Sequence, residues 1–158
     1  MCMMLYIASD NPLPEIPWDE KNPAFYVTSK LWEKAEGIRN IFTKPYVYYL
    51  GSHQKCGCGF GYDNGEEDKR RYDKYPETLA KAIADNNYGR ENMRRLREYL
   101  EAAVELGEVE LYGPLGGNED DEPSSRLHIG PDYFLGEEAG VPIGQFFIVS
   151  KNFTSLGL

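Results

Sequence analysis

The sequence predicts an α+β fold, with a mixed or antiparallel sheet and two helices packed on one of its faces. Short aromatic and β-branched segments bounded by turn residues occur near both ends of the chain. Between them, residues 76–106 have the apolar periodicity of helices. With 158 residues, of which 41% are hydrophobic, we expect one globular domain spanning 1–158.

Three strands are expected before the helical region. Residues 5–9 (LYIAS) and 24–28 (AFYVT) are short apolar segments. The intervening residues 12–23 contain four prolines, which remove N–H donors, so we expect no regular structure there. Ser29 is a candidate cap for a short helix that reaches residue 42. Residues 45–51 (PYVYYLG) are the strongest strand signal, because nearly every one is aromatic or β-branched.

Two helices are expected next, at about 76–86 and 90–106. Pro76 suits a first helical turn, and the segment DNNYG (85–89) is expected to break the pattern. The second helix has an apolar stripe formed by Met93, Leu96, Leu100, Ala103 and Val104. We therefore predict that Leu96, Leu100 and Val104 are buried against the sheet, while Arg90 and Arg97 are exposed.

Three further strands are expected after the helices, at 108–113, 126–130 and 145–150. The first alternates with period two, and the last (QFFIVS) is strongly apolar. The glycine-rich and acidic stretch 116–125 between them is expected to lack regular structure.

The charge balance restricts the possible partners. The chain has 17 basic and 26 acidic residues, a net charge of −9, which argues against a nucleic-acid or anionic-membrane partner. No apolar run approaches the length of about 18 residues that a membrane helix needs. Three cysteines, an odd number, without an export signal predict reduced thiols and a cytoplasmic location.

The segment GSHQKCGCGFGY, residues 51–62, is the one concentration of chemically distinctive side chains. Its cysteines alternate with glycines up to Phe60 and Tyr62, which is typical of a half-buried strand. We therefore predict a β-hairpin between 45–51 and 56–62. In this hairpin, Cys56 and Cys58 are buried and inert, and no metal or cofactor is bound.

Two alternatives for this segment remain open. His53, Cys56 and Cys58 would form a zinc site if residues 53–58 curled around an ion, with a fourth ligand from Cys2, His128 or a carboxylate. Alternatively, Cys56 or Cys58 would be the reactive thiol of an enzyme or redox sensor, with His53 or His128 as its partner. That reading requires a nearby cation to lower the thiol pKa.

No complete catalytic pattern is present: the sequence has no HExxH helix, no Cys-x-x-Cys pair and no Ser/His/Asp order. It has 12 tyrosines, whose rings bury area and still form hydrogen bonds, as binding surfaces require. We therefore predict a non-catalytic binding or interaction protein whose partner is a small molecule or another protein. The candidate binding residues are Tyr46, Tyr48, His53, Cys56 and Cys58.

Overall fold

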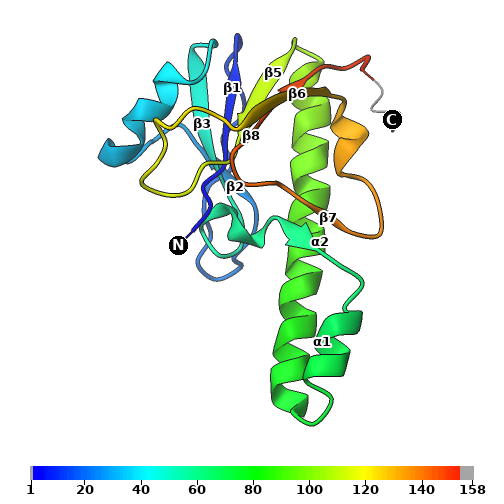
Figure 1. Ribbon diagram of the computed structural model, residues 1–158. Coiled ribbons are helices and arrows are strands. Elements are labelled where there is room, and N and C mark those ends of the chain that lie inside the picture. Colours follow the sequence, from blue (N-terminus) through cyan, green and yellow to red (C-terminus); the bar gives the residue numbers. More distant parts are fainter. Residues whose placement is uncertain (1, 154–158) are drawn as a thin grey trace.

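The computed structural model describes residues 2–153 and has an α+β architecture (Figure 1). A six-stranded mixed sheet has the order β2-β3-β1-β5-β8-β6. Strands β6 and β8 are parallel, and the other neighbours in this sheet are antiparallel. Its strands are β1 (Tyr6–Ser9), β2 (Tyr26–Thr28), β3 (Tyr46–Gly51), β5 (Val109–Tyr112), β6 (Ser125–Ile129) and β8 (Gln145–Val149). A second small sheet pairs β4 (Gly61–Tyr62) with β7 (Ala139–Gly140).

Six of the seven strands predicted for the sheet are confirmed within a few residues, the exception being 56–62, and so is the mixed character of the sheet. The proline-rich stretch 12–23 contributes one isolated bridge, between Ile16 and Val27, and no helix. The stretch 116–125 is irregular up to Ser125, where β6 begins. The helical segments are α1 (Glu66–Arg71), α2 (Pro76–Val104) and the 3₁₀ turns η1 (Glu33–Asn40), η2 (Gly57–Gly59) and η3 (Pro131–Phe134).

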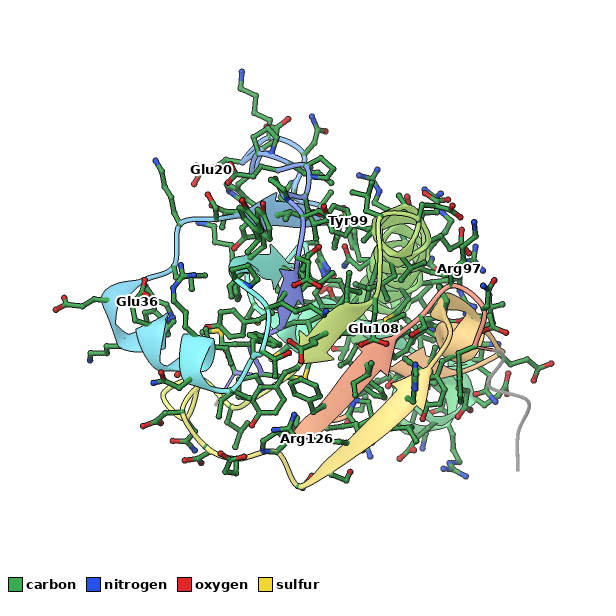
Figure 2. The ribbon with its side chains drawn as sticks, turned by 90° about the horizontal axis from the view of Figure 1, so that it is seen from above. Glu20, Glu36, Arg97, Tyr99, Glu108 and Arg126 are labelled. Carbon is green, nitrogen blue, oxygen red and sulfur yellow. The ribbon has the colours of Figure 1, made fainter. Side chains whose placement is uncertain are left out.

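Both faces of the main sheet are covered, because the strands alternate between two apolar layers. On β1, Leu5 and Ile7 contribute to the core on the α2 side, while Tyr6 and Ala8 contribute to the core on the η1 side. Figure 2 shows α2 on one side of the sheet and η1 on the other. The prediction that α2 packs on one face is therefore confirmed, and the second face is covered by η1, which carries the buried residues Ala35 and Ile38.

The prediction of two helices at 76–86 and 90–106 is wrong, because α2 runs unbroken from Pro76 to Val104. Gly89, in the segment that was expected to break the helix, instead permits a close contact with another part of the chain. A Cβ at Gly89 would lie 1.8 Å from the carbonyl oxygen of Gly61, so Gly89 lets β4 cross the helix at close range. The first half of α2 extends beyond the sheet beside α1 (Figure 1), and its Ile83 side chain is 43% exposed.

Burial along the second half of α2 follows the prediction at most positions. Leu96, Leu100 and Val104 are buried, and Arg90 is exposed. Arg97 is half-buried and not exposed, and it lines a cavity together with Phe134 of η3. Figure 2 shows Tyr99 and Arg97 leaving α2 on different sides.

The predicted hairpin between 45–51 and 56–62 is wrong. Strand β3 forms, but residues 57–59 form η2, and β4 pairs with β7 instead of β3. The glycines of this segment lie where other parts of the chain approach closely, and they do not form one face of a strand. A Cβ at Gly59 would lie 2.3 Å from Ser52 Oγ, and the N–H of Gly57 donates to the carbonyl of Met3 at 2.8 Å.

Within residues 2–153, no helix combines the length and the apolar character needed to cross a membrane.

Candidate functional site

The three cysteines of the chain meet at one point of the surface. Their sulfur atoms all lie within 4.8 Å of one another. Cys2 comes from the segment that leads into β1, and Cys56 and Cys58 come from the loop that follows β3. Because β1 and β3 are antiparallel neighbours, the start of β1 runs beside the end of β3. The sheet therefore brings together cysteines that are more than 50 positions apart in the sequence.

The loop that carries Cys56 is held in shape by its own hydrogen bonds. The N–H of Ser52 donates to the carbonyl of Cys56 at 3.1 Å, and the Ser52 hydroxyl donates to the same oxygen at 2.6 Å. Lys55 has a φ of 71°, a left-handed conformation that is uncommon for residues other than glycine. Two tyrosine hydroxyls, of Tyr26 and Tyr49, donate to the Lys55 carbonyl and hold this turn in place.

Backbone donors also point at the sulfur atoms. The N–H of Met3 lies 3.3 Å from Cys58 Sγ, and the N–H of Cys58 donates to the Cys56 sulfur. Burial, together with the neighbouring thiols of Cys58 and Cys2, nevertheless raises the pKa of the Cys56 thiol to about 11. The groups that shift this pKa include no cation. Cys56 is therefore a neutral thiol at pH 7 when no metal is present.

The prediction that Cys56 and Cys58 are buried is wrong. Cys56 is half-buried, and Cys58 and Cys2 are exposed. The alternation that suggested burial requires an extended strand, whereas η2 turns the chain at Cys58. The cluster consequently lies at the surface, where ions and small molecules have access to it.

His53 lies near this cluster but is not one of its members. Its Nδ1 accepts a hydrogen bond from the Asn92 side chain at 2.7 Å, and its ring stacks on Tyr88 with centroids 4.6 Å apart. Its Nε2 is buried and has no hydrogen-bond partner among residues 2–153. Burial lowers the pKa of this imidazole. His53 and Cys58 both line an open cavity of about 300 Å³, which also contains Asp85.

The two tyrosines predicted as binding residues have different surroundings. Tyr46 is 43% exposed at the start of β3. Tyr48 is buried, and its hydroxyl accepts a hydrogen bond from the N–H of Leu13 at 2.9 Å. Tyr49, which the sequence analysis did not select, lines a cavity together with Tyr6 and Tyr26. The alternation of side chains along β3 could have identified Tyr49, because it places Tyr49 on the opposite face of the strand from Tyr48.

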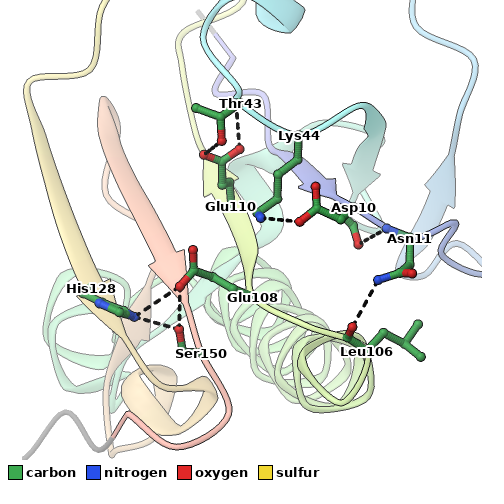
Figure 3. A network of polar contacts seen from close by, with 10 residues as sticks. Asp10, Asn11, Thr43, Lys44, Leu106, Glu108, Glu110, His128 and Ser150 are labelled. Carbon is green, nitrogen blue, oxygen red and sulfur yellow. Dashed lines mark hydrogen bonds and ion pairs between the residues drawn. The ribbon is translucent and has the colours of Figure 1, made fainter.

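His128 belongs to a separate polar network at the other edge of the sheet (Figure 3). Ser150 Oγ donates to Glu108 Oε2 at 3.0 Å and lies 2.7 Å from His128 Nε2. A catalytic triad needs the carboxylate on the second ring nitrogen, so that the histidine can take the serine proton. Here the serine proton goes to the carboxylate, and Glu108 approaches the same Nε2 at 3.8 Å. This network therefore lacks the geometry of an activated serine.

No family model matches this chain, and neither the curated proteins nor the solved structures include a match.

Proposed function

We propose that this chain is a non-catalytic metal-binding protein that holds a thiophilic ion, with Zn²⁺ as the reference case, through Cys2, Cys56 and Cys58. One observation carries the proposal: three sulfur atoms from two separate segments lie within 4.8 Å of one another. The sequence analysis predicted no metal and gave a zinc site of His53, Cys56 and Cys58 as an alternative; the proposed site keeps the two cysteines of that alternative, includes Cys2, which it named as a possible fourth ligand, and leaves out His53.

The separations suit the ion. A Zn–S bond is about 2.3 Å long, so tetrahedral thiolate ligands lie about 3.8 Å apart. The three sulfurs therefore need to approach one another by at most about 1 Å. A fourth position remains for water or another ligand, because Cys2 and Cys58 face solvent. Soft thiolate ligands favour Zn²⁺ and Cu⁺ over Mg²⁺ or Ca²⁺.

The electrostatics favour metal binding over thiol catalysis. A reactive cysteine needs a lowered pKa, whereas the pKa of Cys56 is raised to about 11. A bound cation removes this obstacle, because a thiol that coordinates a metal loses its proton outright. The N–H groups of Met3 and Cys58 then donate to thiolate sulfurs, which strengthens those hydrogen bonds.

The test is cobalt and zinc titration of the reduced, metal-free protein in the presence of a non-thiol reductant. Co²⁺ should produce sulfur-to-cobalt charge-transfer absorption and the intense d–d bands of a tetrahedral site, and one equivalent of Zn²⁺ should remove both. Elemental analysis after dialysis should find one zinc per chain.

Variants assign the ligands. Cys2→Ser, Cys56→Ser and Cys58→Ser should each weaken zinc binding at least tenfold, because each removes one of three ligands. His53→Gln is the matched control and should bind normally, because His53 is bonded to Asn92. Loss of binding in His53→Gln with normal binding in Cys2→Ser would reject this ligand set. Absence of zinc binding in the reduced protein would reject the function itself.

A further inference from the structure

A second cavity lies on the η1 side of the sheet, next to the loop that carries Cys56. It encloses about 230 Å³ and is lined by Tyr6, Tyr26, Tyr49, Trp32, Lys30 and Lys55, together with three further residues. Ligand pockets for drug-sized molecules start at about 300 Å³, so this cavity suits a smaller molecule.

The walls of this cavity are aromatic and arranged edge to face. The rings of Tyr6 and Tyr49 are 5.4 Å apart at 60°, and those of Tyr26 and Tyr49 are 5.9 Å apart at 64°. Their hydroxyls are already engaged with the protein: Tyr26 and Tyr49 donate to the Lys55 carbonyl, and Tyr6 donates to Glu119. The walls therefore present ring faces and ring edges to a ligand, and a planar aromatic molecule is complementary to them.

Trp32 is the most exposed aromatic side chain of the lining. Its side chain is 49% exposed. An indole in this position has a large apolar surface that a bound aromatic ring would remove from water.

The charge around the cavity is opposite to that of the whole protein. The chain has a net charge of −9, yet the lining contains two lysines and no carboxylate. Lys55 has Glu20 at 3.6 Å and lies over Trp18, but both charged side chains are more than 60% exposed, so their pairing is weak. A cationic rim on an acidic protein favours an anionic ligand.

The cavity is formed before any ligand arrives. The Tyr26 ring lies across Gly51, and a Cβ at Gly51 would meet the ring at 1.9 Å. Glycine at this strand position therefore lets the Tyr26 ring lie flat against β3 as one wall. A preformed site of this kind costs little ordering entropy on binding.

We infer that this cavity binds a small planar aromatic molecule with one anionic group, such as an aromatic carboxylate. The ring lies among Trp32, Tyr26 and Tyr49, while Tyr6 is fully buried behind them, and the carboxylate faces Lys30 and Lys55 at the rim. This site is separate from the cysteine cluster, and binding there does not require a metal.

The experiment is calorimetric titration of the full chain with three probes. 2-Naphthoate should bind, 2-naphthamide should bind roughly three- to tenfold more weakly, because it lacks the charge, and cyclohexanecarboxylate should bind more weakly still, because it lacks the aromatic faces. Equal affinity for the first two probes, or no binding of naphthoate, would overturn the inference.

Variants locate the probe. Trp32→Ala should weaken naphthoate binding about tenfold. The double variant Lys30→Gln, Lys55→Gln should bind naphthoate no better than the amide. Lys34→Gln, an exposed lysine of η1 outside the lining, is the matched control and should bind normally. Unchanged binding in Trp32→Ala would place the probe elsewhere and overturn the assignment.

Two variants separate this inference from the proposed metal site. Cys58→Ser should bind zinc at least tenfold more weakly and keep naphthoate, whereas Trp32→Ala should bind naphthoate about tenfold more weakly and still bind zinc, because Trp32 lies outside the loop that carries Cys56. Loss of both ligands in both variants would contradict the separation of the two sites.

Discussion

At the scale of single residues, His53 is a candidate metal ligand or catalytic partner by sequence, yet its contacts in the structure serve the packing of the protein. Its Nδ1 accepts a hydrogen bond from Asn92, which only an unprotonated Nδ1 can do. Its Nε2 is buried without a partner, and the ring stacks on Tyr88. The protein thus favours the neutral imidazole, in agreement with the lowered pKa.

This environment predicts a specific pH dependence of stability. The unfolded chain protonates His53 below a pKa of about 6.5, whereas the folded protein does so only at lower pH. The unfolded state therefore binds more protons in that window, and stability falls as the pH drops from about 6.5 towards the folded pKa. Urea unfolding between pH 7 and pH 5 should show a smaller loss of stability for His53→Gln than for the wild type.

His128→Gln is the matched control for removing a histidine as such. The loss of unfolding free energy between pH 7 and pH 5 should be smaller in His53→Gln than in this control. A wild type and a His53→Gln variant whose unfolding free energies fall in parallel would contradict the assigned environment of His53.

At the scale of elements, β4 crosses α2 at close range at Gly89. In an exposed helix, Gly→Ala stabilises by about 1 kcal/mol, because alanine has the higher helix propensity. At Gly89 the added Cβ would meet the Gly61 carbonyl oxygen at 1.8 Å, and overpacking of this kind costs about 1–3 kcal/mol. We therefore expect Gly89→Ala to destabilise the protein by up to about 2 kcal/mol in urea unfolding, and not to stabilise it.

Ala84→Gly, at an exposed position of the same helix, calibrates the propensity effect. It should cost about 1 kcal/mol. If Gly89→Ala instead stabilised the protein, helix propensity would dominate and the close crossing of α2 and β4 would be wrong.

The elements also show what sequence patterns can and cannot predict here. The six main strands were found because each has a local signature, such as the aromatic and β-branched run at 45–51. Gly57 and Gly89 misled the prediction because each is close to a segment distant in sequence, Met3 for Gly57 and the Gly61 carbonyl for Gly89. Close approach of two segments leaves no periodic signal in either of them.

In the candidate site, too, the local features were predictable from the sequence and the contacts between distant segments were not. Cys56 and Cys58 stood out because only one residue separates them in the sequence. The contribution of Cys2 depends on the antiparallel pairing of β1 with β3, which a local pattern does not specify. His53 was included because it is close in sequence, yet its contacts are with α2, through Tyr88 and Asn92.

At the scale of the whole molecule, the proposed metal would join two distant parts of the chain. Cys2 precedes the first strand, and Cys56 and Cys58 follow the third, so one ion would fasten the N-terminal segment to the loop beside it. A ligand that binds only the folded state stabilises it, by about 2.7 kcal/mol at a free concentration of 100 times Kd. For a protein of this size, 1 kcal/mol raises Tm by about 2–4 °C.

We therefore expect saturating Zn²⁺ to raise the Tm of the reduced protein by about 5–11 °C, and a chelator to reverse the change. Mg²⁺ should have no such effect, because it prefers oxygen ligands. The shift should increase as the pH rises from 6 to 8, because binding releases protons from neutral thiols such as Cys56. Cys2→Ser should lose most of the shift although it leaves the loop of Cys56 and Cys58 intact. If that variant kept the full shift, the ion would be held by the loop alone, and the N-terminal segment would not be part of the site.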